Sequence, residues 1–164
     1  MTILGSTILL AVLLCALVAG FLFAFSTVVM PGIRRLDDRS FLQSFQAIDR
    51  VIQDGQLLFM LVWVGSVVVL VISAVTGFLH LRGLNRLLAV SACITCLAGV
   101  QLPTIAINIP LNNRIQALDP GSMSGARLAE ERSQFEARWT RWNTIRTMFA
   151  ALVVMQVILL AYRI

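Results

Sequence analysis

Residues 55–79 read GQLLFMLVWVGSVVVLVISAVTGFL and contain no charged side chain. A helix of this length is about 37 Å long, which exceeds the hydrocarbon core of a bilayer, about 30 Å thick. Three more segments are apolar in the same way, at about 3–30, 87–111 and 147–162. The last of these is short on its own, but the amphipathic segment before it can extend it. The sequence therefore predicts four membrane-spanning helices.

The composition of the whole chain agrees with this prediction. Of 164 residues, 59% are hydrophobic and 13% are charged, and the mean hydropathy is +0.88. A soluble domain carries about 25% charged residues, so the soluble and disordered classes are excluded. All 13 basic residues are arginine, and the acidic residues leave a net charge of +5. No basic run or reader motif is present, so we expect no nucleic acid as partner. These arginines are expected to meet lipid phosphates of the bilayer or to pair with acids in the loops.

The fold class follows from the continuity of the apolar runs. Barrel strands would alternate polar and apolar residues, so the runs predict helices. We expect an all-α protein with a single membrane domain over residues 1–164, built as a transmembrane four-helix bundle. Two amphipathic helices are predicted outside the membrane, at about 40–54 and 126–146. The second continues the last span, so this helix has an extramembrane extension.

Turn signals mark the boundaries of the first long connection. Pro31 and Gly32 predict the end of the first helix, since proline lacks a backbone donor and glycine permits a turn. Ser40 and Gln43 form a capping-box pattern that predicts the start of the next helix. Apolar side chains share one face of that helix: Phe41, Phe45, Ile48 and Ile52. We expect this amphipathic helix to lie on the membrane or to lead into the second span.

Small residues recur every four positions in two spans, a pattern that lets helices pack closely in lipid. They are Ala16, Gly20 and Ala24 in the first span, and Ser91, Thr95 and Gly99 in the third. We therefore expect both spans to contact a neighbouring helix along these stripes.

The distribution of arginine predicts the orientation. Chain topology places the segments 31–54 and 112–146 on one side of the membrane, and both termini with the 80–86 turn on the other. Ten of the 13 arginines lie on the first side. By the positive-inside rule we expect a multi-pass protein of the cell membrane with both long segments in the cytoplasm.

Polar side chains within the spans are costly and are candidates for function. In the third span they fall on one helix face: Gln101, Thr104, Asn108 and Asn112. Pro103 and Pro110 lie among them and predict a kinked backbone with freed carbonyl groups. The third span therefore carries a polar face at the end where the long segments lie.

The fourth helix carries a matching polar face at the same end. Its members are Trp139, Asn143, Arg146 and Thr147, with Trp142 one turn before the arginine. Ser26 reaches the same level from the first span, and Arg50 and Gln46 lie on the helix that follows it. We predict that these groups meet at one mouth of the bundle.

A fixed guanidinium among amides suits an anionic or enolate-like oxygen, and aromatic side chains suit a flat apolar ring. The predicted catalytic residues are Arg146, Asn143, Asn108 and Asn112. The predicted substrate-binding residues are Trp139, Trp142, Arg50, Gln46, Gln101, Thr104 and Ser26. Tryptophan and arginine at a helix end are also common membrane anchors, and asparagine can simply join helices.

Cys93 and Cys96 form a C-x-x-C motif, as in quinone-linked thiol oxidoreductases. A reactive pair needs a helix N-terminus and access, whereas this pair lies inside an apolar helix, so structural cysteines are favoured. His80 is the only histidine and lies at the opposite membrane face. One histidine cannot give bis-histidine haem ligation or a histidine-based metal site, so we predict no metal site and no cofactor. Haem held in another way stays open.

Four blocks of the sequence, in order along the chain, resemble one known family. They are residues 20–26, GFLFAFS; residues 45–50, FQAIDR; residues 108–112, NIPLN; and residues 139–147, WTRWNTIRT. Each block alone is a weak signal, but the four in order are specific. Together they resemble the anthrone-oxygenase-like family of small bacterial and fungal integral membrane proteins, most of which have no assigned function.

The resemblance implies a four-span bundle and, for a minority of members, oxidation of polycyclic anthrones to anthraquinones by oxygen. It also implies six site positions: Arg50, Asn108, Asn112, Trp139, Asn143 and Arg146. Two positions depart from the family pattern. Many members have histidine where this chain has Thr144, and asparagine often stands in place of Asp49.

Three functional hypotheses stay open at this point. The first is a polar pocket for a flat lipophilic phenolic or quinone-like molecule, in an anthrone-type oxygenase that uses molecular oxygen without a cofactor. The second is a non-enzymatic small-molecule-binding or accessory membrane subunit, with a homo-oligomer or protein partner bound through helix 126–146. The third is a thiol-quinone oxidoreductase that uses Cys93 and Cys96.

Overall fold

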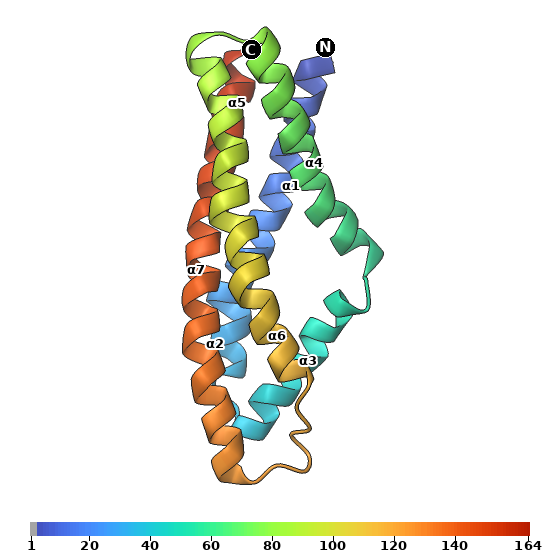
Figure 1. Ribbon diagram of the computed structural model, residues 1–164, viewed down its shortest axis with the longest axis vertical. Helices are drawn as coiled ribbons and strands as arrows, with labels where there is room; N and C mark the ends of the chain where they lie inside the picture. The colour runs from blue at the N-terminus through green and yellow to red at the C-terminus, as the bar shows by residue number, and fades with distance from the viewer. Residues whose placement is uncertain (1–2) are drawn as a thin grey trace.

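The structure is a computed structural model that describes residues 3–164 (Figure 1). Four helical stretches are long and apolar enough to cross a membrane: Leu4–Ile33, Leu57–His80, Gly83–Gln116 and Gly125–Arg163. The four predicted spans lie within or largely within them. No strand occurs among the described residues. The prediction of an all-α, multi-pass membrane protein is therefore confirmed.

Two of the four stretches are built from several elements. The first consists of α1 (Ile3–Ala24), the π-helical turn η1 (Phe25–Val29) and α2 (Met30–Ile33). The third consists of α5 (Gly83–Cys96), the π-helical turns η2 (Leu97–Gln101) and η3 (Thr104–Asn108), and α6 (Ile109–Gln116). The second and fourth stretches are α4 (Leu57–His80) and α7 (Gly125–Arg163), and α3 (Asp38–Gln53) connects the first to the second.

Each of the three π-helical turns ends two residues before a proline, namely Pro31, Pro103 or Pro110. A proline cannot bond the carbonyl group four residues upstream, and its ring needs room beside that group. A π-helical turn widens the helix there without ending it. The first helix therefore ends at Ile33, one residue after the expected end at Pro31 and Gly32, because η1 accommodates the proline ring.

The start of α3 also differs from the prediction. Its N-cap is Asp37, whose carboxylate accepts a hydrogen bond from the backbone N–H of Ser40 at 3.1 Å. This bond stabilises the charged carboxylate and lowers the pKa of Asp37. The capping box that Ser40 and Gln43 suggested is wrong, since Ser40 already lies in the first turn of the helix.

The apolar face of α3 packs on protein. Phe41 and Phe45 are buried, and the ring of Phe45 lies 4.6 Å from that of Phe135 and 5.4 Å from that of Trp139, both on α7. α3 leads into the second span, α4, which is one of the two expected arrangements, and its hydrophobic face was correctly predicted. The aromatic rings of α7 cover it, and α3 crosses the lower half of the molecule in Figure 1.

The four long stretches lie side by side. α1 packs against α4 and α7, and α5 packs against the same two helices, around an apolar core. Both termini and the α4–α5 link lie at one end of the molecule, and the links that follow α2 and α6 lie at the other (Figure 1). This arrangement agrees with the predicted topology. The placement of the second end in the cytoplasm stays a prediction.

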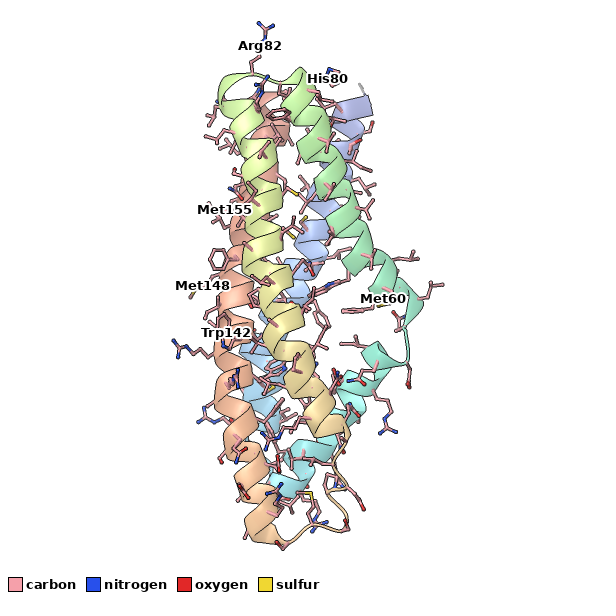
Figure 2. The ribbon with its side chains drawn as sticks, viewed as in Figure 1. Met60, His80, Arg82, Trp142, Met148 and Met155 are labelled. Atoms are coloured by element: carbon pink, nitrogen blue, oxygen red, sulfur yellow. The ribbon has the colours of Figure 1, made fainter. Side chains whose placement is uncertain are left out.

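The outward faces of the long helices are apolar and exposed. Met148 and Met155, which point outward from α7 in Figure 2, are both 68% exposed. Leu13 on α1 and Val68 on α4 are exposed as well. Large apolar side chains on the outside suit a helix whose solvent is lipid.

The last helix is continuous for 39 residues, as the joining of segment 126–146 to the last span predicts. Its N-terminal half is packed on one side, because α3 and α6 cover its inner face. The outer face carries exposed arginines, Arg138 and Arg141 among them. The inner face of the extension is therefore packed in the folded core, and its outer face is exposed.

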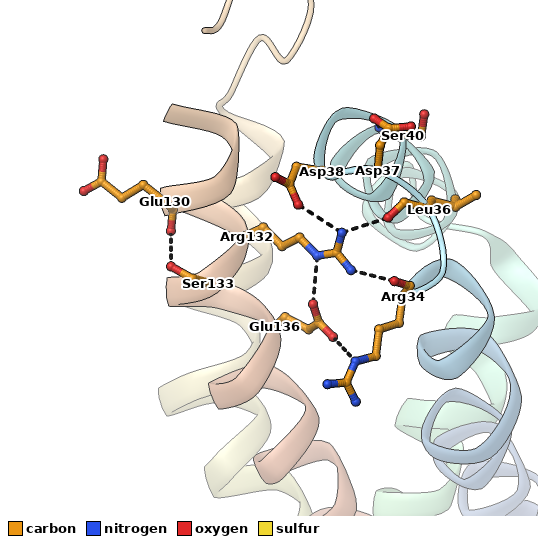
Figure 3. A network of polar contacts seen from close by, with 9 residues as sticks. All are labelled: Arg34, Leu36, Asp37, Asp38, Ser40, Glu130, Arg132, Ser133 and Glu136. Atoms are coloured by element: carbon orange, nitrogen blue, oxygen red, sulfur yellow. Dashed lines mark hydrogen bonds and ion pairs between the residues drawn. The ribbon is translucent and has the colours of Figure 1, made fainter. Parts of the chain in front are cut away.

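Arg132 fastens this extension to the link between α2 and α3 (Figure 3). Its guanidinium donates to the backbone oxygens of Arg34 at 2.7 Å and Leu36 at 2.9 Å. It also forms ion pairs with Asp38 at 3.0 Å and Glu136 at 2.9 Å. Four partners on three segments make this side chain a structural tie between α7 and the start of α3.

Gly99 lies where the third stretch packs closely against α7. A Cβ atom added there would lie 2.3–2.7 Å from three atoms of Phe149. Nothing lies within 4 Å of the corresponding point at Gly20. Of the two predicted small-residue stripes, the one in the third span thus makes the close helix contact at its glycine.

We predict that Gly99→Ala lowers the free energy of unfolding by about 1–3 kcal/mol, because the methyl group would overlap Phe149. Gly20→Ala is the matched control and should keep or raise stability, because the added methyl group meets no atom within 4 Å. Thermal unfolding of the two variants in the same detergent measures the difference. Equal stability of both variants would contradict the close packing of η2 against α7.

Candidate functional site

The centre of the candidate site is the guanidinium of Arg146, near the middle of α7. The residue is 4% exposed. Its Nη1 donates to Oγ1 of Thr104 at 2.8 Å, and its Nη2 donates to Oδ1 of Asn143 at 2.9 Å. The third stretch and the fourth helix therefore turn their polar faces toward each other.

Arg146 has no acidic partner in the structure described. The ion pairs of residues 3–164 involve Arg34, Arg114, Arg127 and Arg132, and none includes Arg146. Its Nε atom is buried and has no hydrogen-bond acceptor. A buried cation without an anion is costly, so this arrangement needs a reason other than stability.

Asn143 positions the arginine. It is 1% exposed, and its amide nitrogen donates to the backbone oxygen of Leu22 at 3.1 Å and to Oγ of Ser26 at 2.7 Å. Its amide oxygen is thereby turned toward Arg146. The backbone of the first stretch thus fixes the amide that holds the guanidinium.

A second set of hydrogen bonds, from Trp139 through Asn112 to Asp49, lies below Arg146 in the direction of α3. The heights of Arg146 and Asp49 along the bundle are called the upper and the lower level of the site. The indole Nε1 of Trp139 donates to Oδ1 of Asn112 at 2.7 Å, and Nδ2 of Asn112 donates to Oδ1 of Asp49 at 2.7 Å. Nδ2 of Asn108 lies 3.5 Å from the backbone oxygen of Trp139, and its Oδ1 is buried without a donor. Trp139 therefore connects the level of Arg146 to that of Asp49, and the centre of its ring lies 6.0 Å from Cζ of Arg146.

A cavity of about 210 Å³ lies between these two levels. Its polar lining consists of Arg146, Asn143, Thr104, Asn108, Asn112 and Asp49. Its apolar lining consists of Phe21, Leu22, Phe25, Phe45, Ile52, Phe59, Met60, Trp63, Ile109 and Trp139. Six aromatic side chains from α1, η1, α3, α4 and α7 therefore surround one set of polar groups.

The cavity lies at the first two turns of α4. Because α4 is 24 residues long, about 36 Å, its start marks one boundary of the membrane. Met60, at this end of α4 in Figure 2, lines the cavity and is 41% exposed. Ile52, at the end of α3, is half-buried. The cavity therefore opens toward the α3–α4 link.

Asp49 is the main polar group that the site prediction left out. It is 4% exposed, and its carboxylate accepts hydrogen bonds from three amides, those of Asn112, Gln53 and Gln116, at 2.7–3.0 Å. Burial raises the pKa of Asp49, and the three amide bonds oppose that shift. A sequence signal was present, because an acid on the apolar face of an amphipathic helix is unusual.

Two predicted site residues lie just behind the cavity lining. Ser26 holds Asn143, and Gln101 accepts a hydrogen bond from Nε1 of Trp63 at 3.1 Å, which orients that ring. Both therefore support lining residues without lining the cavity themselves.

Three other predicted residues lie away from the cavity. Arg50 is exposed, and Trp142 on α7 is half-buried and does not line the cavity. Gln46 donates to the backbone oxygens of Ile115 and Leu118, which ties α3 to the end of α6. Thr144 also lies outside the lining, and its hydroxyl donates to the backbone of Thr140.

The cysteine pair is far less accessible than thiol chemistry needs. Cys93 and Cys96 are free thiols, 8% and 6% exposed. Cys96 and Cys15 pack in the apolar core between α1, α4, α5 and α7. Cysteines in such surroundings are inert.

Residues 50–155 match the protein family described as Anthrone oxygenase, and this range is more than half of the chain. The chain belongs to the anthrone oxygenase family. The matched range includes Arg146, Asn143, Asn108, Asn112 and Trp139, and it begins directly after Asp49. Comparisons with curated proteins and with solved structures found no match.

We predict that this anthrone oxygenase family member keeps or gains stability when Arg146 is replaced by Met, an apolar side chain of similar length. Removal of an unpaired buried charge offsets the loss of its two hydrogen bonds. Arg132→Met is the matched control, and it should lower the free energy of unfolding by about 1–2 kcal/mol because it removes four partners. Thermal unfolding in detergent provides the comparison. A larger loss for Arg146→Met than for Arg132→Met would make Arg146 a structural anchor.

Proposed function

We propose that this protein binds a flat, lipophilic phenolic or quinone-like molecule in the cavity and oxidises it as an anthrone-type oxygenase. The observation that carries the proposal is the buried guanidinium of Arg146, which has no carboxylate partner and lines an aromatic cavity. Preorganised donors of this kind stabilise negative charge that develops on an oxygen during a reaction.

The cavity suits a fused aromatic ring system. An apolar cavity of about 150 Å³ accepts a benzene ring, and this one has a volume of about 210 Å³ and opens on one side. The rings of Phe25 and Trp139 lie 5.7 Å apart, and those of Phe59 and Trp63 are stacked at 5.5 Å. A flat ring can pack against these faces, and a lipophilic molecule can reach the opening at the membrane boundary.

An anthrone has a carbonyl group and, across the central ring, an acidic CH₂ group. Loss of a proton from this carbon places negative charge on the carbonyl oxygen, where Arg146 would stabilise it. One dioxygen molecule then oxidises the ring: one oxygen atom becomes the second carbonyl, and the other leaves as water. The proposal needs molecular oxygen as co-substrate and no bound cofactor.

The other polar residues take different parts in this proposal. Oδ1 of Asn108 has no donor and can accept a hydrogen bond from a substrate hydroxyl. Asn143 holds the guanidinium, and Asn112 holds the indole of Trp139, on which the ring would stack. Asn143 and Asn112 are therefore positioning residues, and Arg146 is the group that touches the reacting oxygen.

A second candidate function is a binding or accessory subunit without catalysis. The outer face of α7 favours it, because Arg138 and Arg141 are exposed there and take part in none of the ion pairs found among residues 3–164. A partner with an acidic surface could pair with them. Co-purification of one stoichiometric protein, together with absence of turnover, would favour this function over the oxygenase.

We predict that the purified protein accelerates the conversion of anthrone to anthraquinone in air, measured by the absorbance of the quinone. Arg146→Met should lower the rate by about 100-fold or more, as the loss of an oxyanion donor does in other enzymes. Arg141→Met, an exposed arginine on the same helix, should retain the full rate.

Binding is measured separately from turnover. Anthraquinone should quench the fluorescence of Trp63 and Trp139, which line the cavity, and a Trp139→Phe variant should show less quenching. Full oxidation by Arg146→Met would contradict the role of the guanidinium. Neither quenching nor oxidation by the wild type would contradict the proposed function.

A further inference from the structure

Asp49 occupies the lower level of the cavity, on an element different from those that carry the other polar groups. It lies near the end of α3, between Phe45 and Ile52, which also line the cavity. Its three hydrogen-bond donors are neutral amides, and no ion pair among residues 3–164 includes it. Its negative charge therefore has no cation beside it.

Two buried and opposite charges thus line the same cavity, each without a counter-ion. Arg146 is held at one level by Thr104 and Asn143, and Asp49 is held at the other by amides of α3 and α6. The two do not pair directly, and the side chain of Trp139 connects their levels. Each charge alone is costly to bury.

We propose that Asp49 is the catalytic base of this site, which takes a proton from an acidic C–H group of the ligand while Arg146 stabilises the resulting oxyanion. The substrate class is then an aromatic ketone with an acidic CH₂ group at the end of the ring system away from its carbonyl. This inference rests on the proposed function and adds the residue that starts the reaction.

The transfer removes both uncompensated charges in one step. A C–H bond of the ligand breaks, and the proton forms an O–H bond with the carboxylate of Asp49. The electron pair of the C–H bond moves through the ring to the carbonyl oxygen, which becomes an enolate. The neutral acid and the ion pair between enolate and Arg146 replace an isolated anion and an isolated cation, so the product state gains electrostatic stability in the cavity.

The three amides hold the carboxylate of Asp49 in place for this role. Gln53 and Gln116 donate to Oδ2 at 2.7 and 3.0 Å, and Asn112 donates to Oδ1 at 2.7 Å. A carboxylate oxygen has two lone pairs, so Oδ1 keeps one for a ligand proton. Burial raises the pKa of Asp49, which makes its carboxylate a stronger base than that of an exposed aspartate.

The test is anaerobic exchange of the anthrone CH₂ protons for deuterium in D₂O, followed by proton NMR. Oxygen is absent, so only proton transfer is measured. The wild type should accelerate the exchange, and Asp49→Asn should lose about 100-fold or more of the protein-dependent rate. Asp54→Asn, which removes an exposed acid just after α3, is the matched control and should exchange like the wild type.

A second measurement, the pH dependence of exchange by the wild type, covers the case that Asp49→Asn does not fold. The base form is needed, so the rate should rise with pH through a pKa above the usual value of about 3.9 and then stay constant. The hydrogen-bond partners of Asp49 on α3 and α6 are amides. α7 contributes Trp139 and Arg146 to the lining, and α1, η1 and α4 contribute apolar side chains, so no other acid titrates among the lining residues.

The outcomes separate the two proposals. Exchange and oxidation that survive Asp49→Asn overturn the role of Asp49 and leave the proposed oxygenase standing. Exchange that needs Asp49, without oxidation in air, supports the base and overturns the oxygenase. Exchange that rises in proportion to hydroxide without a plateau, or no acceleration by the wild type, overturns Asp49 as a base.

Discussion

The proposed chemistry depends on one constraint: the guanidinium of Arg146 is buried between the third stretch and α7, and no ion pair among residues 3–164 includes it. The fold around it can be understood as the means of holding it. Asn143 and Thr104 each satisfy one nitrogen, and the backbone of Leu22 fixes Asn143. Nε stays unsatisfied. A guanidinium that is fixed by two hydrogen bonds and has one donor without an acceptor is suited to a ligand with a partial or full negative charge on oxygen.

The proline-associated turns and α3 create the space beside this cation. Thr104 and Asn108, the first and last residues of the π-helical turn η3, both line the cavity, and Phe25, the first residue of η1, lines it as well. Wide turns of this kind are frequent at functional sites, because they change the direction of side chains within a continuous helix. α3 then brings Phe45 and Asp49 under the cavity, and the tie through Arg132 keeps the start of α3 on α7. Aromatic walls, a cation and an acid thus meet where the membrane begins.

The spans, the long last helix and the polar faces of the third and fourth spans could be predicted, because helical periodicity and hydropathy are local properties of the sequence. The spacing of Asn108 and Arg146 therefore indicated a shared polar site. Asp49 could not be placed in the same way, since its position depends on how α3 packs, and its apolar face was compatible with membrane as well as with protein. Arg50 and Trp142 were chosen by spacing or resemblance alone. The sequence of a helix shows which side chains share a face, but it does not show whether that face borders a cavity, another helix or lipid. The π-helical turns before the prolines could not be predicted, because such a turn has no clear sequence signal.

The most direct test of the central claim is an experimental structure of the protein with a brominated anthraquinone, in which anomalous scattering locates the bromine. The account predicts that the ring lies in the cavity beside Trp139, with one quinone oxygen within about 3 Å of a nitrogen atom of Arg146. A guanidinium that faces lipid or pairs with a carboxylate of the protein, with the bromine elsewhere, would contradict it.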